Sequence, residues 1–243
     1  MMLLKKNTTM DVKTLSAKLG VTETTIRKDF TFLANQGLIV RTYGAAIIAD
    51  QKDMIRLVSK VLSESIEEKE KIARTASEII RGGMMVMIDT GSTTYKLVPF
   101  IKGLPITIVT NSLLVASRIT PNAIPDLVMI GGQLSKYCMG FIGPIAKHDL
   151  SQLYADILFL GTAGYSIKDD ILTCASIEEA EMKRTMMNHA KSIVLLADSS
   201  KHEKKGYAVY GKVSDLSIII TDALELADIE ELNSMKVETI IAK

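Results

Sequence analysis

Hydrophobic positions near the start of the chain recur at the spacing of short amphipathic helices. Residues 12–19 form one such segment, and Gly20 follows it as a helix stop. A second helix is expected at once, because Thr22 is a good cap and apolar residues recur after it every three or four positions. Its expected buried stripe is Ile26, Phe30 and Leu33. Gly37 ends this helix and residues 38–48 form two short β-branched strands, so the pattern predicts a winged helix-turn-helix over residues 1–49.

The pattern changes after this segment. Residues 50–64 are charged, weakly periodic and free of glycine and proline, which predicts a helical connector between two domains. Later, short apolar runs alternate with helix-length segments. The expected strands are 84–88, 106–109, 127–130, 157–160, 193–197 and 218–220. Such runs indicate a parallel sheet buried on both faces, so residues 65–243 are predicted to form a doubly wound, mostly parallel α/β domain.

Two capping boxes are expected in this domain, Ser65 with Glu68 and Ser176 with Glu179. The helix after Ser176 places Lys183 on an otherwise apolar face formed by Ala180, Met187 and Ala190. Two interpretations of this lysine stay open. Its stem packs while its ammonium reaches water, or the ammonium points toward the strand ends as a partner for a phosphate or a hydroxyl.

Charge is distributed unevenly along the chain. The net charge is +1, but residues 1–49 carry seven lysines and arginines against three acids, a net +4, which leaves −3 for the remainder. A basic head on a slightly acidic body is typical of a small DNA-binding module joined to a sensor, although ordinary surface charge gives the same pattern.

Other residues mainly exclude classes of protein. Two cysteines, Cys138 and Cys174, are too few for a disulfide-built fold and suit free thiols in a reducing compartment. We find no signal-peptide pattern and no apolar run approaching about 18 residues, so a cytoplasmic protein without a membrane partner is expected. The three histidines, His148, His189 and His202, lack metal-ligand spacing, so neither a metal site nor a cofactor is expected.

Small polar residues cluster where the predicted strands end. The carboxyl ends of parallel strands meet at one edge of a sheet, where helix N-termini offer free N–H groups to anions. Each loop alone resembles an ordinary cap or turn, but together they favour a phosphate site; the glycine patterns of dinucleotide sites and P-loops are absent, which disfavours nucleotides. The expected ligand residues are Asp89, Thr90, Gly91, Ser92, Thr93, Thr94, Thr110, Asn111, Ser112, Gly161, Thr162, Gly164, Lys183, Asp198 and Lys201.

The same loops leave two enzymatic alternatives. The run Asp89–Ser92 is similar to an aspartic-protease loop, but those enzymes pair two such loops in an all-β frame and this chain has one before a helix. A sugar-phosphate isomerase or deaminase is the stronger alternative. Its acid and base groups would come from Asp89, Glu178, Glu181, Lys183 and Asp198. The basic head argues against an enzyme, and a pure protein-interaction module would leave the hydroxyl-rich loops unexplained.

Two sets of motifs occur in a fixed order. The first comprises Gly20–Phe30, Gly37-Leu38 and Arg41–Gly44. The second comprises Glu70–Ala73, Asp89–Thr94, Thr110–Ser112, Gly131-Gly132, Phe141-x-Gly143, Phe159–Gly161, Lys183 and Asp198–Lys201. Over nearly its whole length the chain thus resembles the DeoR family of bacterial sugar-metabolism repressors. Relative to that family the first helix, here residues 1–6, is expected to be short, and Ala45 replaces the second glycine of the wing.

The resemblance implies a repressor of a sugar-metabolism operon that a small phosphorylated sugar releases from operator DNA. It implies a sensor fold shared with ribose-5-phosphate isomerase, glucosamine-6-phosphate deaminase and coenzyme A transferases, and a homo-oligomer, a dimer or tetramer, on repeated operator sites. Basic side chains are expected to contact DNA phosphates, and Thr24 and Thr25 are expected to contact base edges. The expected DNA-binding residues are Thr22, Thr24, Thr25, Arg27, Lys28, Arg41, Thr42 and Tyr43.

Overall fold

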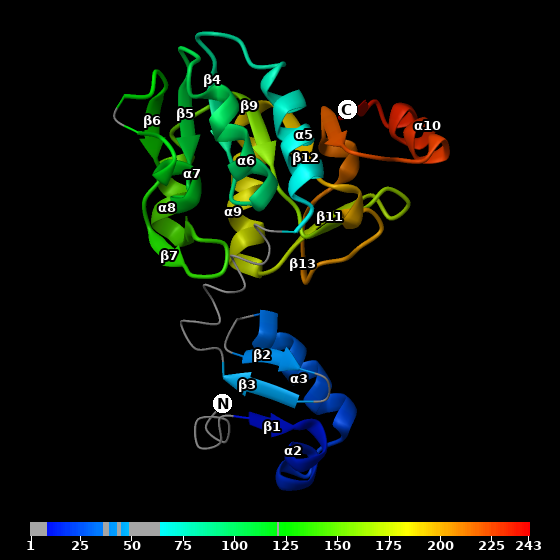
Figure 1. The fold of residues 1–243 in the computed structure, drawn as a ribbon. Helices are drawn as coiled ribbons and strands as arrows, with labels where there is room; N and C mark the ends of the chain where they lie inside the picture. The colour runs from blue at the N-terminus through cyan, green and yellow to red at the C-terminus, as the bar shows by residue number, and fades with distance from the viewer. Residues whose placement is uncertain (1–8, 36–38, 43–44, 49–63, 121) are drawn as a thin grey trace. The chain divides into compact units, whose positions relative to one another are not determined.

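The computed structural model describes residues 9–35, 39–42, 45–48, 64–120 and 122–243; at 9–10, 32–35, 39–42 and 45–48 it describes only the backbone (Figure 1). Contacts divide the chain into two compact units, residues 1–61 and 62–243. The expected first helix lies outside the described residues, as does the expected connector up to residue 63.

The first unit is a helix-turn-helix, as predicted, with a three-stranded antiparallel sheet in place of the predicted two strands. Its elements are β1 (Thr9–Asp11), α2 (Val12–Leu19), α3 (Glu23–Asn35), β2 (Ile39–Thr42) and β3 (Ala45–Ile48). Strand β3 lies between β2 and β1, and β1 is the strand that the hydrophobic pattern did not predict.

Local contacts explain where the helices of this unit begin and end. Asp11 caps α2 by accepting from the Thr14 N–H at 2.8 Å, and Gly20 ends it in the left-handed region with φ 66°. The predicted cap of the next helix is confirmed, because the Thr22 hydroxyl accepts from the Thr25 N–H at 3.2 Å. Four apolar side chains from the two helices are buried: Val12, Leu15, Ile26 and Phe30.

The second unit is built on a seven-stranded sheet whose described pairings are all parallel. Its strands are β4 (Met85–Ile88), β5 (Thr107–Thr110), β6 (Asp126–Met129), β9 (Ala155–Leu160), β12 (Ala190–Leu196), β14 (Ile218–Thr221) and β15 (Glu238–Ile241). The order across the sheet is β15-β14-β12-β9-β4-β5-β6. All six predicted strands are present. The chain progresses outward to one side of β4 and then to the other, so the topological switch point lies between β4 and β9.

Helices pack on both faces of this sheet. They are α5 (Ile66–Ser77), α6 (Ser92–Ile101), α7 (Leu113–Ser117), α8 (Gly143–Leu150), α9 (Ile177–Asn188) and α10 (Leu226–Ser234). Alternate strand residues feed two separate cores. Val86 and Ile88 belong to the core with α5, α6 and α7, whereas Met87 belongs to the core with α8, α9 and α10. The doubly wound prediction is therefore confirmed. No helix in the described ranges is both long and apolar enough to cross a membrane.

Two small antiparallel elements were not predicted. One is the hairpin of β7 (Gln133–Ser135) and β8 (Gly140–Ile142), and the other is a sheet of β10 (Gly164–Ser166), β11 (Ile171–Cys174) and β13 (Ala208–Gly211). Short 3-10 turns at η1 (Ser199–Lys201) and η2 (Val213–Asp215) complete the fold.

The two expected capping boxes have different outcomes. Ser65 adopts a left-handed conformation, φ 48°, and its side chain does not cap α5, so the first is wrong. Ser176 does cap α9, accepting from the Glu179 N–H at 3.1 Å. The Glu179 carboxylate accepts from the Ala175 N–H at 3.2 Å, and not from the Ser176 N–H as a capping box requires. The second box is therefore half confirmed.

Candidate functional site

The site lies at the carboxyl ends of β4 and β9, at the topological switch point. Asp89 follows β4 and Gly161 follows β9, and the two are joined directly, because the Gly161 N–H donates to Asp89 Oδ2 at 3.1 Å. Gly91 lies against Gly161: a Cβ at Gly91 would come 3.1 Å from Thr94 Oγ1 and 3.6 Å from the Gly161 Cα. The two strand-end loops thus lie close together at this glycine. In such sheets the switch point is where ligands bind.

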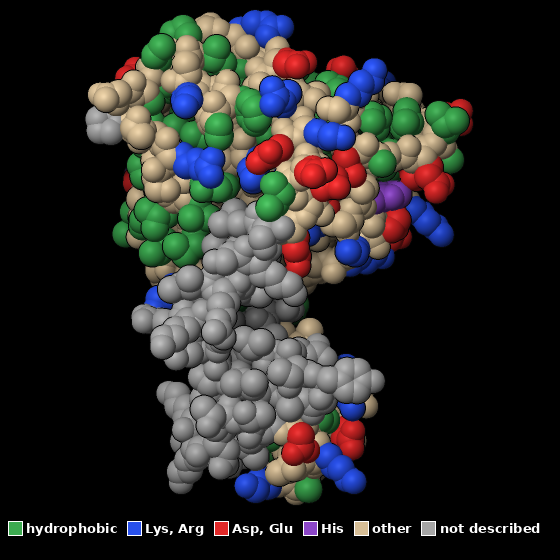
Figure 2. All heavy atoms as spheres, viewed as in Figure 1, with side chains coloured by type: hydrophobic (Ala, Val, Ile, Leu, Met, Phe, Trp, Pro, Cys, Tyr) green, Lys and Arg blue, Asp and Glu red, His purple; other side chains and the backbone are tan. Residues whose placement is uncertain are grey.

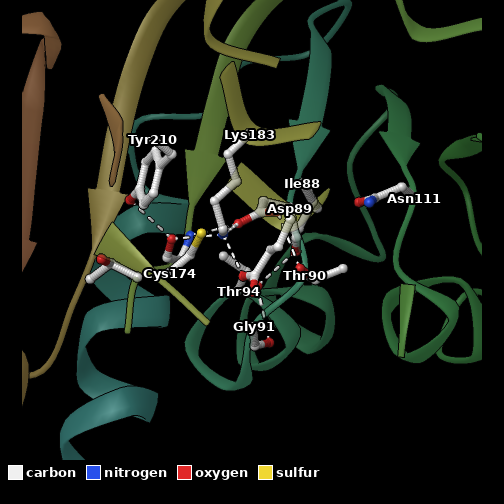
Figure 3. A network of polar contacts seen from close by, with 12 residues as sticks. Ile88, Asp89, Thr90, Gly91, Thr94, Asn111, Cys174, Lys183 and Tyr210 are labelled. Atoms are coloured by element: carbon white, nitrogen blue, oxygen red, sulfur yellow. Dashed lines mark hydrogen bonds and ion pairs between the residues drawn. The ribbon is translucent and has the colours of Figure 1, made fainter. Parts of the chain in front are cut away.

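Lys183 reaches this point from α9 (Figure 3). Its ammonium is only 1% exposed and donates to Asp89 Oδ2 and, at 3.0 Å, to the Gly161 carbonyl. Glu179, one turn earlier on α9, places Oε1 3.3 Å from the same ammonium. The interpretation in which the ammonium reaches water is therefore wrong. The ammonium therefore has two hydrogen bonds and one further ion pair within the protein.

Electrostatics keep this cluster charged. Burial alone would lower the pKa of Lys183, but the carboxylates of Asp89 and Glu179 outweigh burial and raise this pKa well above its ordinary value. Tyr210 lies beside the cluster, with its ring centroid 5.3 Å from the ammonium and its hydroxyl 3.2 Å from the Gly161 carbonyl. Burial raises the pKa of the neighbouring Cys174 thiol to about 12, so this cysteine is not a nucleophile at neutral pH.

Glu179 is the acidic residue that the sequence interpretation missed in this role. Glu178 and Glu181, chosen as acid and base groups, lie elsewhere: Glu178 is exposed, and Glu181 pairs with Lys147 of α8 at 3.0 Å. The spacing of four between Glu179 and Lys183 is the signal that identifies the pair, because residues four apart share a helix face.

Most strand-end hydroxyls are already used inside the protein. Thr94 donates to the Asp89 carbonyl at 2.8 Å, Thr110 to the Ile88 carbonyl at 2.6 Å, and Thr162 to the Gly164 carbonyl at 2.8 Å. Each of these hydroxyls therefore already has an acceptor within the protein and helps to satisfy a backbone carbonyl.

The first turn of α6 has a different character. Gly91 occupies its N-cap position and supplies no capping side chain. The N–H groups of this turn therefore lack the usual acceptor. Ser92 and Thr93 lie here, and neither hydroxyl has a hydrogen-bond partner among the described residues. Thr90 is buried beside them and donates to Asp89 Oδ1 at 3.3 Å.

Three further charged groups lie near the carboxyl end of β12. Asp198 accepts from the Ser200 N–H at 3.2 Å and so holds the turn η1, which ends at Lys201. Lys69 of α5, a residue the sequence interpretation missed, is 2% exposed and donates to the Glu64 carbonyl at 2.7 Å. Burial lowers the pKa of Lys69, Asp198 opposes this effect, and Lys201 reinforces it. Lys69 occupies the apolar stripe of its helix, which is the signal that had singled out Lys183.

The remaining predicted ligand residues make contacts of their own within the protein. Asn111 donates from Nδ2 to the Phe141 carbonyl at 2.8 Å, and Ser112 caps α7 by accepting from the Val115 N–H at 3.3 Å. Gly164 lies against another backbone segment, because a Cβ there would come 2.2 Å from the Lys204 carbonyl oxygen. Within the described ranges no group of three or more His, Cys, Asp and Glu side chains is arranged to hold a metal ion.

The predicted DNA-binding residues fall on α3, just before it and on the wing. The exposed side chains are Thr22, Thr24, Thr25, Arg27 and Lys28, and Arg27 lies 3.5 Å from Glu23. Arg41 and Thr42 belong to β2, where only the backbone is described, and Tyr43 lies outside the described residues.

Comparison with known proteins decides the family. Residues 64–223 match the DeoR C-terminal sensor domain, and residues 1–52 match the DeoR-like helix-turn-helix domain. The chain belongs to the DeoR family. Its relatives include the putative aga operon transcriptional repressor of Escherichia coli O157:H7, 30% identical over 98% of this chain and 90% of that protein. Another is the transcriptional repressor GlcR of Bacillus subtilis, 29% identical over 91% of this chain and 85% of that protein. The prediction of a DeoR-family transcriptional regulator is confirmed.

Solved structures also match part of this DeoR-family chain, at low identity. Ribose 5-phosphate isomerase A from Methanocaldococcus jannaschii is 19% identical, with 57% of this chain and 55% of that chain covered and a TM-score of 0.42. The match to eIF2B delta from Chaetomium thermophilum is 12% identical, covers 68% of this chain and 59% of that chain, and has a TM-score of 0.45.

In this DeoR-family protein, replacing Lys183 should strongly destabilise the sensor domain. Lys183→Met leaves Asp89 and Glu179 buried without their cation, so the free energy of unfolding should fall by about 3–5 kcal/mol. Lys147→Met, which removes the half-exposed pair with Glu181, should cost less than about 1 kcal/mol. Denaturant unfolding followed by circular dichroism measures both. Because the folded pKa of Lys183 lies above its ordinary 10.5, its contribution should be complete below pH 10.5 and disappear only as pH rises past the folded pKa. Equal small losses in the two variants would contradict this.

Proposed function

We propose that this protein is a cytoplasmic transcriptional repressor of a sugar-metabolism operon, released from operator DNA when a small phosphorylated sugar binds its sensor domain. The observation that carries the proposal is the uncapped first turn of α6 at the switch point, with a buried lysine and a half-buried lysine nearby. We also propose residues 1–49 as the DNA-binding domain, 50–64 as the linker and 65–243 as the sensor domain.

The first turn of α6 is suited to a phosphate. Uncapped N–H groups and the positive end of the helix dipole both favour an anion. Ser92 and Thr93 add two hydroxyl donors at the same turn. Glycine at position 91 lets the bound group approach the backbone closely.

Two lysines supply the positive charge. Lys69 and Lys201 repel each other, which is one reason for the lowered pKa of Lys69, so an anion bound between them would relieve the repulsion. Lys183 has a different role in this proposal. Its donors are occupied by Asp89, Glu179 and the Gly161 carbonyl, so it positions the loop and neutralises a carboxylate that would repel phosphate.

Loss of Lys201 should weaken effector binding without unfolding the sensor. Hydrogen bonds to charged groups contribute about 1.5–3 kcal/mol, so Lys201→Ala should weaken the binding of a sugar phosphate by roughly tenfold to a hundredfold. The matched control is Lys205→Ala, which removes an exposed lysine paired with Asp169 at 2.5 Å. Calorimetric titration with glucose 6-phosphate, fructose 6-phosphate and ribose 5-phosphate measures both. An equal response of the two variants would sink the assignment of Lys201.

The surface of the helix-turn-helix unit supports the DNA-binding part of the proposal. Figure 2 shows basic side chains at the surface of this unit, and Arg27 and Lys28 are exposed on α3. Such residues neutralise DNA phosphates, while Thr24 and Thr25 on the same helix are the candidates for base contacts. A chain with one helix-turn-helix reads a repeated operator as a dimer or tetramer, so we propose a homo-oligomer.

Arg27→Ala and Lys28→Ala should each weaken DNA binding and lower its salt dependence. Each lost phosphate contact reduces the log–log salt slope by about one unit. The operator is first selected from random duplex DNA with the wild-type protein, and affinity is then measured at two salt concentrations. Lys191→Ala, an exposed lysine of β12, is the control and should match wild type. Unchanged affinity in both α3 variants would remove α3 from the DNA interface.

We further propose that the protein is not an isomerase or deaminase. Both carboxylates nearest the switch point, Asp89 and Glu179, are engaged by Lys183, which leaves neither free to act as a base. Incubation of the purified protein with ribose 5-phosphate and glucosamine 6-phosphate should therefore give no isomerised or deaminated product by NMR. Turnover that Lys183→Met abolishes would establish the enzymatic alternative.

A further inference from the structure

Asn111 carries a buried acceptor without a partner. The residue follows β5, is 2% exposed, and its Oδ1 has no hydrogen-bond donor in the described part of the chain. A buried unpaired acceptor costs free energy, and native proteins tolerate few of them. The oxygen therefore requires an explanation beyond packing.

The amide cannot turn this oxygen elsewhere. Asn111 Nδ2 donates to the Phe141 carbonyl at 2.8 Å, so exchanging the two amide atoms would bring two carbonyl oxygens together. Backbone bonds hold the same contact: the Phe141 N–H donates to the Asn111 carbonyl at 2.8 Å, and the Leu113 N–H to the Met139 carbonyl at 2.9 Å. The orientation of Oδ1 is consequently fixed by the bonds between Asn111 and Phe141 of β8.

The fixed oxygen lies beside the proposed phosphate site. In Figure 3 the amide of Asn111 is turned toward the end of β4, where Asp89 and Thr90 lie. Gly140 fills the space between: a Cβ there would come 2.3 Å from Thr90 Cγ2 and 3.5 Å from Asn111 Nδ2. Asn111 thus borders the loop that opens α6.

We infer that Asn111 Oδ1 accepts a hydrogen bond from a hydroxyl group of the effector, which makes Asn111 the residue that distinguishes a sugar phosphate from inorganic phosphate. The inference rests on the proposed effector site. The phosphoryl group of a sugar phosphate dianion offers only acceptor oxygens, which Oδ1 would repel, whereas a sugar hydroxyl donates, and inorganic phosphate has no sugar hydroxyl to offer. The site then has two parts: N–H, hydroxyl and ammonium donors for the phosphate, and one rigid acceptor for the sugar. Sites built to pair a ligand hydroxyl reject analogues that lack it.

The test compares two ligand classes in one variant. Full-length wild type and Asn111→Ala are titrated calorimetrically with inorganic phosphate and with glucose 6-phosphate, fructose 6-phosphate and ribose 5-phosphate. In wild type at least one sugar phosphate should bind more tightly than phosphate. In Asn111→Ala that sugar phosphate should bind roughly tenfold more weakly, as expected for one lost hydrogen bond, while phosphate affinity stays within about twofold. Retained phosphate binding also shows that the variant is folded; Asn111→Ser replaces it if Asn111→Ala does not melt cooperatively.

A second variant controls for loosening of the hairpin. Leu134→Gly weakens β7, which pairs with Phe141 of β8, without changing Asn111, and it should keep the wild-type preference for the sugar phosphate. Loss of that preference in Leu134→Gly as well, or equal weakening of both ligands in Asn111→Ala, would overturn the inference in favour of a structural role. Unchanged binding in Asn111→Ala would assign Oδ1 to a bound water. If wild type binds phosphate but no sugar phosphate more tightly, only this inference fails; if no phosphate compound binds, the proposed function fails with it.

Discussion

The buried ammonium of Lys183 connects three elements that are far apart in the chain. It joins α9 to the residue after β4, through Asp89, and to the residue after β9, through the Gly161 carbonyl. Burying such a group is costly unless it is paired, and here Asp89 and Gly161 accept hydrogen bonds from it while Glu179 adds a second ion pair. Because Asp89 also accepts from the Gly161 N–H, the same carboxylate fixes the separation of the two strand ends. The geometry of the switch point depends on this one cation.

This arrangement also determines the charge that a ligand meets. An isolated carboxylate at the end of β4 would repel a phosphate arriving at α6. Lys183 removes that repulsion by pairing with the Asp89 carboxylate, while Lys69 and Lys201 lie near the end of β12. In the function that we propose, the cluster therefore supports the anion site, and its own donors need not touch the anion.

The hydrophobic pattern was sufficient for the elements that carry most of the core. Short apolar runs predicted six of the parallel strands; Ile157–Leu160, for example, is buried on both faces. Strand β6 was predicted as well, although it lies at an edge and most of its residues are exposed. Strand β15 was missed because Glu238 and Thr239 leave it only two consecutive apolar residues. The hairpin β7–β8 and the strand β10 are too short to give a periodic signal. Their positions depend on contacts with the strand ends, which no local pattern encodes.

The sequence predicted where the candidate site lies, but it predicted fewer of the contacts that its side chains make. The order of strands and loops indicates which side chains meet at the carboxyl edge, but a hydroxyl there can serve the protein or a ligand. Thr110 shows the difficulty: its donor goes to the Ile88 carbonyl, 22 residues earlier, and only the packed sheet reveals this. Strand-end loops must first satisfy their own backbone groups, because a buried unpaired carbonyl is costly. Only polar groups that are not needed for this pairing remain available for recognition of a ligand. Among the described residues of this sheet they include the uncapped turn at Ser92 and Thr93 and the unpaired oxygen of Asn111, which is why the effector site that we propose is built on them.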